Sequence, residues 1–184
     1  WDHFDLHTTQ GRLRLTDPRR FGALLWHAGA RGDVSRHPRL AGLGIEPFDA
    51  RFGAGWLFDG MRARRASIKQ VLLAGDVVVG VGNIYASESL FRAGIDPRLP
   101  ALRLGRRRCG RLADAIRDVL REAIDAGGST LRDFAGTDGA YGDFTRFARV
   151  YGREGQPCTV CGRRIRKLVQ GQRATYYCSR CQRR

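Results

Sequence analysis

The chain has 184 residues, a formal net charge of +15, a sequence pI near 11.0 and 42% hydrophobic residues. This positive charge exceeds what solubility requires, so it favours a polyanionic partner: nucleic acid in the first place, with an anionic membrane surface as the alternative. The sequence has no run of about 18 apolar residues and no signal-like amino-terminal segment, which argues against a membrane span and against export. We therefore expect a soluble, cytoplasmic protein.

Residues 1–28 alternate between apolar and polar residues in the manner of β-strands, which we expect at 4–6, 13–15 and 23–26. Three short strands bury little surface, so we interpret them as the end of a larger β domain. Residues 29–49 are rich in Gly, Pro and Arg without periodicity, and we expect a linker there.

Helical patterns dominate the middle of the chain, and we expect helices over 50–65, 67–74, 82–93 and 105–126. The last pattern is the clearest, because Leu112, Ile116 and Val119 recur at helical spacing and a pair of glycines at 127–128 is a typical helix stop. The residues that follow, 129–143, are rich in glycine and small polar residues, so we expect a mobile loop.

The last quarter of the chain contains two Cys-x-x-Cys pairs, formed by Cys158, Cys161, Cys178 and Cys181. Each pair can direct two thiolates at one centre, so the spacing predicts a zinc ribbon with one structural Zn2+ in a four-sulfur site. Between the pairs we expect two strands around a turn near Gln170–Gly171.

The ribbon region is strongly basic. Residues 147–184 contain ten Arg or Lys and a single acid, Glu154, which favours contact with a polyanion. The alternative is a purely structural zinc clip on a solvated basic tail. The fifth cysteine, Cys109, is interpreted as an ordinary free thiol.

A glycine-rich turn, Gly80–Asn83, precedes the third expected helix. It begins like a dinucleotide-binding fingerprint, but the third glycine is replaced by Tyr85 and no βαβ repeat surrounds it, so no nucleotide cofactor is expected. Such a turn lets backbone amides and the Asn83 side chain face one anion, which suits a phosphate. The alternative is that Asn83 is simply the N-cap of the helix.

Three segments, 17–22, 79–91 and 172–178, closely resemble those of bacterial formamidopyrimidine-DNA glycosylases. The first contains Asp-Pro-Arg-Arg-Phe-Gly and the second contains Asn-Ile-Tyr-Ala-Ser-Glu; a ribbon of matching spacing ends the chain. The resemblance covers all 184 residues. It implies an α+β fold in which an amino-terminal β-sandwich, a helix-two-turn-helix domain and a four-cysteine zinc ribbon follow one another.

The resemblance also implies domain boundaries. We expect the remnant of the β-sandwich in 1–28, the linker in 29–49, the helix-two-turn-helix DNA-binding domain with its lesion loop in 50–146, and the zinc ribbon in 147–184.

By the same resemblance, the protein would be a base-excision repair enzyme that is both a DNA glycosylase and an AP lyase. Its substrates would be oxidised purines, namely 8-oxoguanine and formamidopyrimidines, and it would cut the strand by successive β- and δ-elimination. The implied partner is double-stranded DNA with an oxidised purine or an abasic site. We expect a bacterial, nucleoid-associated monomer.

Matching motifs imply several DNA-binding residues. Lys69 and Asn83 would grip the phosphates around the damaged nucleotide, and Arg64 would be another basic contact. Arg19 would bond the orphaned cytosine after the lesion has swung out, and Phe21 would wedge into the base stack. A planar donor and an aromatic wedge recover part of the cost of base flipping.

Arg173, near the tip of the ribbon hairpin, resembles a residue that contacts phosphate and donates a proton in δ-elimination. An arginine stays protonated at neutral pH, so the phosphate contact is the better supported of its two roles. Residues 127–144 resemble the loop that closes over the flipped base.

Four residues of the family pattern have no match here: the terminal proline nucleophile, the adjacent glutamate, a further lysine and a methionine of the insertion triad. The chain starts at Trp1, so we expect it to be the carboxy-terminal part of a glycosylase that binds DNA without efficient catalysis. Lys69 is the only other candidate amine, since Lys167 lies in the ribbon, and its match to a phosphate contact argues against a nucleophilic role.

Three alternatives stay open. The chain could be a noncatalytic module that senses bent or damaged DNA. It could be a structural zinc protein of the ribosome or of transcription, which would need only the basic ribbon. Within the enzyme class, the nearest rival is the endonuclease VIII branch, which acts on oxidised pyrimidines.

Overall fold

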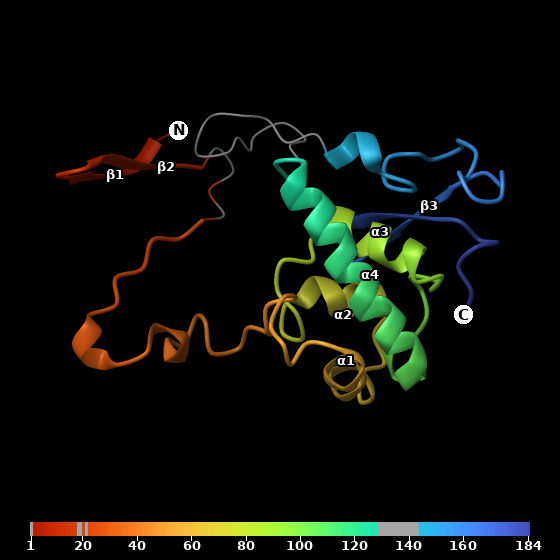
Figure 1. Ribbon diagram of the computed structural model, residues 1–184, viewed down its shortest axis with the longest axis horizontal. Helices are drawn as coiled ribbons and strands as arrows, with labels where there is room; N and C mark the ends of the chain where they lie inside the picture. Colours follow the sequence, from red (N-terminus) through yellow and green to blue (C-terminus); the bar gives the residue numbers. More distant parts are fainter. Residues whose placement is uncertain (1, 18–19, 21, 129–143) are drawn as a thin grey trace. The chain divides into compact units, whose positions relative to one another are not determined.

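The structure is a computed structural model that describes residues 2–17, 20, 22–128 and 144–184 (Figure 1). It divides into two compact units, Trp1–Ala41 and Gly42–Arg184. In the part of the chain that is described, no helix is both long enough and apolar enough to cross a membrane.

The first unit is built on one antiparallel hairpin. Strand β1 (Asp2–Thr8) pairs with β2 (Gly11–Thr16), with Leu6 opposite Leu13. Two short 3-10 helices follow, η1 (Gly29–Arg31) and η2 (Val34–Arg36).

The third strand expected at 23–26 is not formed, so this prediction is wrong. Leu24 and Trp26 are exposed by 60% and 88%, and no strand among the described residues pairs with this segment. Alternating apolar residues form a strand only where a neighbouring strand supplies the hydrogen bonds and a packed face.

The described part of the second unit contains four α-helices and a second hairpin (Figure 1). The helices are α1 (Ala54–Met61), α2 (Ile68–Ala74), α3 (Asn83–Arg92) and α4 (Arg106–Asp125), with 3-10 turns η3 (Ala101–Arg103) and η4 (Phe144–Phe147). The antiparallel strands β3 (Arg166–Gln170) and β4 (Arg173–Tyr177) form the hairpin, with the turn where the sequence predicts it.

One apolar core joins the four helices. Leu57 of α1, Leu72 of α2 and Leu90 of α3 are at most 1% exposed, and Leu112 and Ile116 of α4 are fully buried. Helix α4 lies against both α1 and α3, as its apolar stripe requires. Its end is a Schellman motif, in which the Gly128 N–H donates to the Ala123 carbonyl at 2.7 Å.

A short strap, residues 43–45, runs beside the segment that leads into α3. Ile45 and Val78 form a parallel bridge, and the Val79 N–H donates to the Ile45 carbonyl at 3.1 Å. Gly44 lies so close to the Val77–Val78 backbone that a Cβ there would meet it at 2.3 Å. The strap is therefore part of the second unit and anchors the segment that leads into α3.

The ribbon docks on α3 and on the segment that follows it. Ile95 and Arg183 form a parallel bridge, and the Gln182 side chain donates to the Ile95 carbonyl at 2.8 Å. Phe91 of α3 packs in a small apolar cluster with Val150 and Ile165.

Candidate nucleic-acid interface and zinc site

The four ribbon cysteines converge on one point. Their sulfur atoms all lie within 4.8 Å of one another, with Cys158 and Cys181 3.8 Å apart and Cys161 and Cys178 3.5 Å apart. A tetrahedral site with Zn–S bonds of about 2.3 Å separates its sulfur atoms by about 3.8 Å. The donor set and its spacing therefore fit a four-sulfur zinc site.

A hollow of about 460 Å³ lies where α2, the start of α3 and the ribbon turn meet. Its lining includes Gln70 of α2, Gly82 and Asn83 at the start of α3, and Gly171 and Arg173 of the hairpin. Residues that are far apart in the sequence thus share one concave surface, and this surface contains two of the residues expected to contact DNA.

The turn that carries Arg173 has a defined geometry. Gly171 and Gln172 have φ angles of 53° and 61°, and two consecutive left-handed residues are typical of a type I′ hairpin turn. The turn is held against the helices, because the Gln170 side chain donates to the Ser67 hydroxyl at 2.9 Å. The backbone position of Arg173, the first residue of β4, is therefore fixed relative to the helices.

Asn83 is the first residue of α3, not its N-cap. Gly82 occupies the N-cap position without a side-chain cap, so the alternative interpretation of Asn83 as a simple cap is wrong. The first backbone N–H groups of a helix have no intrahelical acceptor and carry the positive end of the helix dipole. The buried Asn83 Oδ1 also has no hydrogen-bond partner among the described residues. The start of α3 therefore has polar groups available for a ligand.

Lys69 is placed differently from Asn83 and Arg173. It is fully buried, and its Nζ donates to the Ala174 carbonyl at 2.9 Å and to the Thr175 hydroxyl at 2.8 Å. It is not among the residues that line the hollow. Burial first, and then the nearby Arg173 charge, lower the pKa of Lys69 from 10.5 to about 8. In this structure Lys69 ties α2 to β4.

Arg64 also lies outside the hollow. Its guanidinium donates to both carboxylate oxygens of Asp76, at 2.7 and 3.0 Å.

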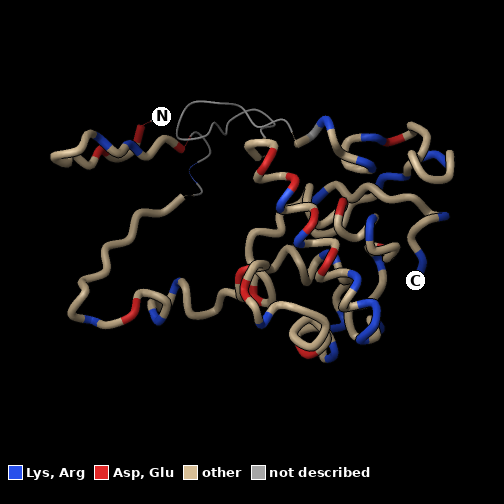
Figure 2. The backbone as a smooth tube through the Cα atoms, in the orientation of Figure 1, with Lys and Arg blue, Asp and Glu red and all other residues tan. Residues whose placement is uncertain are grey.

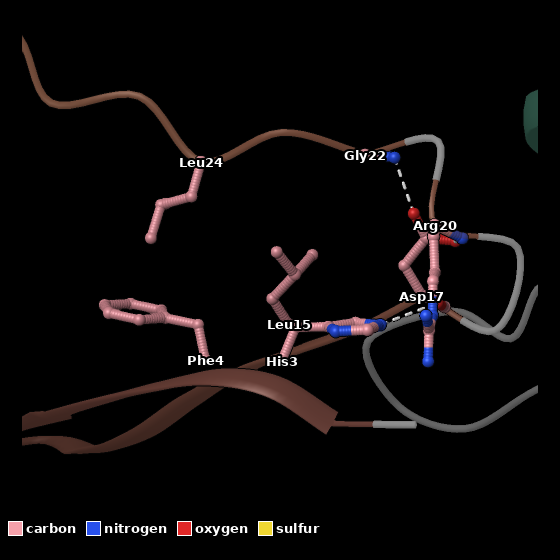
Figure 3. A pocket seen from close by; sticks show the side chains of 7 residues that line it. All are labelled: His3, Phe4, Leu15, Asp17, Arg20, Gly22 and Leu24. Carbon is pink, nitrogen blue, oxygen red and sulfur yellow. Dashed lines mark hydrogen bonds between the residues drawn. The ribbon is translucent and has the colours of Figure 1, made fainter.

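Arg19 and Phe21 fall outside the described residues, whereas Asp17, Arg20 and Gly22 are described. The Asp17 carboxylate accepts the Arg20 N–H at 3.0 Å and the Gly22 N–H at 2.5 Å. Figure 3 shows Asp17 and Arg20 on one side of a hollow of about 430 Å³, with Phe4 and Leu24 on the other. Asp17 thus holds the backbone of Arg20 and of Gly22. Most of the expected lesion loop, 129–143, also lies outside the described residues.

Glu88 joins the helices to the ribbon and was not expected as a functional residue. This carboxylate is fully buried in α3 and accepts three backbone N–H groups, from Arg149, Val150 and Tyr151, at 2.8–2.9 Å. A signal was present, because Glu88 lies one helical turn from Ile84 and from Phe91, on an otherwise apolar face. An acid at such a position needs buried donors.

Comparisons with known proteins agree with this architecture. A family model described as "Formamidopyrimidine-DNA glycosylase H2TH domain" matches residues 43–135, and one described as "Zinc finger found in FPG and IleRS" matches residues 155–184. The second match and the four-cysteine geometry together make the ribbon a site for one structural zinc ion. The α+β fold expected from the sequence, with its helix-two-turn-helix domain and ribbon, is confirmed.

Individual relatives extend over the whole chain. The formamidopyrimidine-DNA glycosylase of Bordetella petrii is 60% identical over 184 residues, which is 100% of this chain and 67% of that protein. The structure of MutM (Fpg) from Thermus thermophilus has a TM-score of 0.86 at 42% identity, covering 97% of this chain and 67% of that one. A structure of MutM in complex with carbocyclic 8-oxo-G containing DNA has a TM-score of 0.85 at 31% identity, covering 100% and 66%. The chain thus spans about two thirds of the length of its relatives, and it belongs to the formamidopyrimidine-DNA glycosylase family.

Proposed function

We propose that this chain binds damaged duplex DNA as part of base-excision repair, and that the hollow at the start of α3 receives a backbone phosphate beside the damaged nucleotide. The observation that carries this proposal is the meeting of Asn83, the amino-terminal end of α3 and Arg173 on one concave surface. Helix N–H groups and a guanidinium are both donors suited to a phosphate oxygen. Residues 50–146 would supply the helix-two-turn-helix part and residues 147–184 the ribbon.

The proposed lesions are oxidised purines, 8-oxoguanine and formamidopyrimidine. This is supported by the family and by the relative whose structure contains carbocyclic 8-oxo-G DNA. In this proposal Arg19 and Phe21 occupy the space left by the flipped nucleotide, and Asp17 holds the backbone of the neighbouring Arg20 and Gly22. The partner would be double-stranded DNA, bound by a single protein chain.

Lys69 contributes indirectly in this proposal. Its ammonium is committed to the Ala174 carbonyl and the Thr175 hydroxyl, so it fixes β4, and with it Arg173, against α2. Its charge still acts on a phosphate in the hollow through Coulomb attraction, because the surroundings are partly desolvated. Arg64, paired with Asp76, would need to leave that carboxylate before contacting DNA.

A direct test is the affinity of the zinc-loaded chain for a duplex with an abasic-site analogue. Asn83→Ala should weaken binding by about tenfold, the value of one lost hydrogen bond from the Asn83 Nδ2 amide to a charged phosphate oxygen. The matched control is Gln10→Ala, which removes an exposed carboxamide from the first unit. Equal affinities for the two variants would show that the start of α3 lies off the DNA.

We further propose that these 184 residues bind a lesion without cutting the strand at a useful rate. In the family pattern a terminal proline amine attacks the sugar, and no segment of this sequence matches that motif. The remaining candidate amine, Lys69, is buried and already hydrogen-bonded, which prevents it from attacking.

Borohydride trapping tests this second proposal, because it reduces an imine between protein and sugar to a stable bond. These residues should give no efficient covalent adduct with abasic DNA, whereas a longer version beginning Met-Pro-Glu should give one. Efficient trapping by the 184 residues, abolished by Lys69→Gln, would identify Lys69 as the nucleophile and overturn the proposal.

A further inference from the structure

A second basic hollow lies at the opposite end of α3 from Asn83. It measures about 350 Å³ and is formed by the end of α3, the first half of α4 and the last residues of the ribbon. Four of its lining residues are arginines: Arg92, Arg108, Arg111 and Arg183. Helix α3 has ten residues, so the two hollows are separated by about 15 Å along its axis at 1.5 Å per residue.

Among the described residues, only Arg92 of these four arginines has an acidic partner. It forms a bidentate pair with Glu122 at 2.5 Å. Arg108 donates to the Arg183 carbonyl at 2.7 Å, which builds the floor of the hollow but adds no negative charge. Within the described part of the chain, no acidic side chain forms an ion pair with Arg108, Arg111 or Arg183. Burial, and then the Arg111 charge, lower the pKa of Arg108.

The arginines at the start of α4 are electrostatically unfavourable for the helix. Residues 106–108 place three arginines in the first turn of a 20-residue helix, where the dipole favours negative charge and no acid is present. Figure 2 shows basic residues at the start of this helix and at the carboxyl terminus. Apolar packing does not require these charges, and an anion in the hollow would offset their repulsion.

The lining favours a phosphodiester over an acidic peptide. The other lining residues are Ala93, Gly94 and Cys181, so the hollow offers no aromatic or large aliphatic side chain. As a zinc ligand Cys181 is a thiolate, and it is the one negatively charged group of this lining, against four guanidinium groups. Protein partners usually anchor on such side chains, whereas nucleic-acid backbones bind mainly through phosphate contacts with Arg and Lys. Guanidinium groups also match the geometry of phosphate oxygens.

We propose that this distal hollow binds the backbone of a second DNA segment, so that one chain can hold two duplexes at opposite ends of α3. This site is distinct from the hollow assigned under the proposed function, and its contacts are sequence-independent. Holding two segments would let the protein move from one to the other without full release.

The test is a bridging assay with two short duplexes, one labelled with a donor fluorophore and one with an acceptor. At about 0.1 M salt the zinc-loaded chain should bring them together, which is seen as energy transfer that falls when protein is in large excess. Arg111→Glu should lower bridging at least about tenfold, through loss of a charged hydrogen bond and added repulsion. Arg111 is exposed, so this change should leave the fold intact, as a melting curve can verify.

The control is Arg121→Glu, an equal charge reversal at an exposed position of the same helix outside the hollow. It should leave bridging within about twofold of the unchanged chain, because exposed charges beyond a Debye length of about 10 Å are largely screened. Asn83→Ala should weaken binding of the first duplex, whereas Arg111-dependent binding of the second duplex should persist. This separates failure of this proposal from failure of the proposed function.

Four results would overturn the proposal. The first is absence of energy transfer with the unchanged chain. The second is equal loss of bridging in Arg111→Glu and Arg121→Glu. The third is that Arg111→Glu lowers the affinity for the first duplex as much as it lowers bridging, which would mean that one duplex spans both hollows. The fourth is Arg111-dependent binding of a glutamate-rich peptide without binding of a second duplex, which would make the occupant a protein.

Discussion

The helical part and the ribbon of the second unit are held together by different forces. In the helices, fully buried apolar side chains from α1 to α4 meet in one core. In the ribbon, the buried apolar set is small, and it includes the metal ligands Cys158 and Cys178 themselves. A module of this size cannot offset its chain entropy by apolar burial alone. The helices should therefore tolerate loss of metal, whereas the ribbon and the residues that it positions should not.

The largest expected effect follows removal of zinc. A chelator should unfold residues 155–184 while the helices of residues 54–125 stay folded, because structural zinc contributes about 10–16 kcal/mol of apparent binding free energy in small zinc modules. Amide spectra recorded with and without chelator will show which residues move. Cys178→Ser should reproduce the loss, whereas Cys109→Ser should keep the zinc, since Cys109 is buried in the helical core. Unchanged ribbon resonances after zinc removal would show that the ribbon does not depend on zinc for its stability.

The next effect concerns Glu88, the buried link between the two parts. Glu88→Ala should lower the free energy of unfolding by about 3–5 kcal/mol, because three buried N–H groups lose their charged acceptor. Glu88→Gln should retain part of the stability, since its amide oxygen still accepts. The control is Glu122→Gln, whose partly exposed pair with Arg92 should contribute about 1 kcal/mol or less. Denaturant unfolding will rank the variants, and similar losses at positions 88 and 122 would refute the special role of Glu88.

A smaller effect is expected from the titration of Lys69, which joins α2 to the ribbon. Its pKa is about 8 in the folded chain and near 10.5 when unfolded, so the unfolded state binds more protons between these values. Stability should therefore rise with pH across this window, by at most about 3 kcal/mol, and the full cost of the buried charge should be present below pH 8. Lys69→Met should remove this rise in urea unfolding measured from pH 7 to 10. A parallel pH dependence in both proteins would show that the Lys69 ammonium is solvated.

The smallest effect on stability, and a specific one on binding, is expected for Arg173→Ala. Arg173 is exposed and lines the hollow, so unfolding should change little. Under the proposed function, the slope of the logarithm of the DNA association constant against that of the salt concentration should fall in magnitude by about one unit. Anisotropy titrations between about 50 and 200 mM salt provide the slope. Arg121→Ala should leave the slope unchanged.

Much of this arrangement could be predicted from the sequence where a pattern is local. Cysteine spacing predicts the zinc ligands because each pair acts within one turn, and the long stripe of α4 predicts a helix because its period repeats many times. The expected strand at 23–26 failed because pairing depends on a neighbour that a local pattern cannot show. Lys69 shows most clearly what the sequence could not predict, because its partners, Ala174 and Thr175, lie more than one hundred residues away in the sequence. Only tertiary structure could show that this lysine faces a ribbon strand.

Gly44 carries a consequence for the gene as well as for the fold. A Cβ at this position would meet the backbone of Val77 and Val78 at 2.3–2.4 Å, and backbone cannot yield as a flexible side-chain end can. Every single-base change in a glycine codon either preserves glycine, introduces a stop or adds a Cβ. Codon 44 should therefore show only synonymous changes among functional alleles, although residue 44 lies in a short strap that lines none of the three hollows.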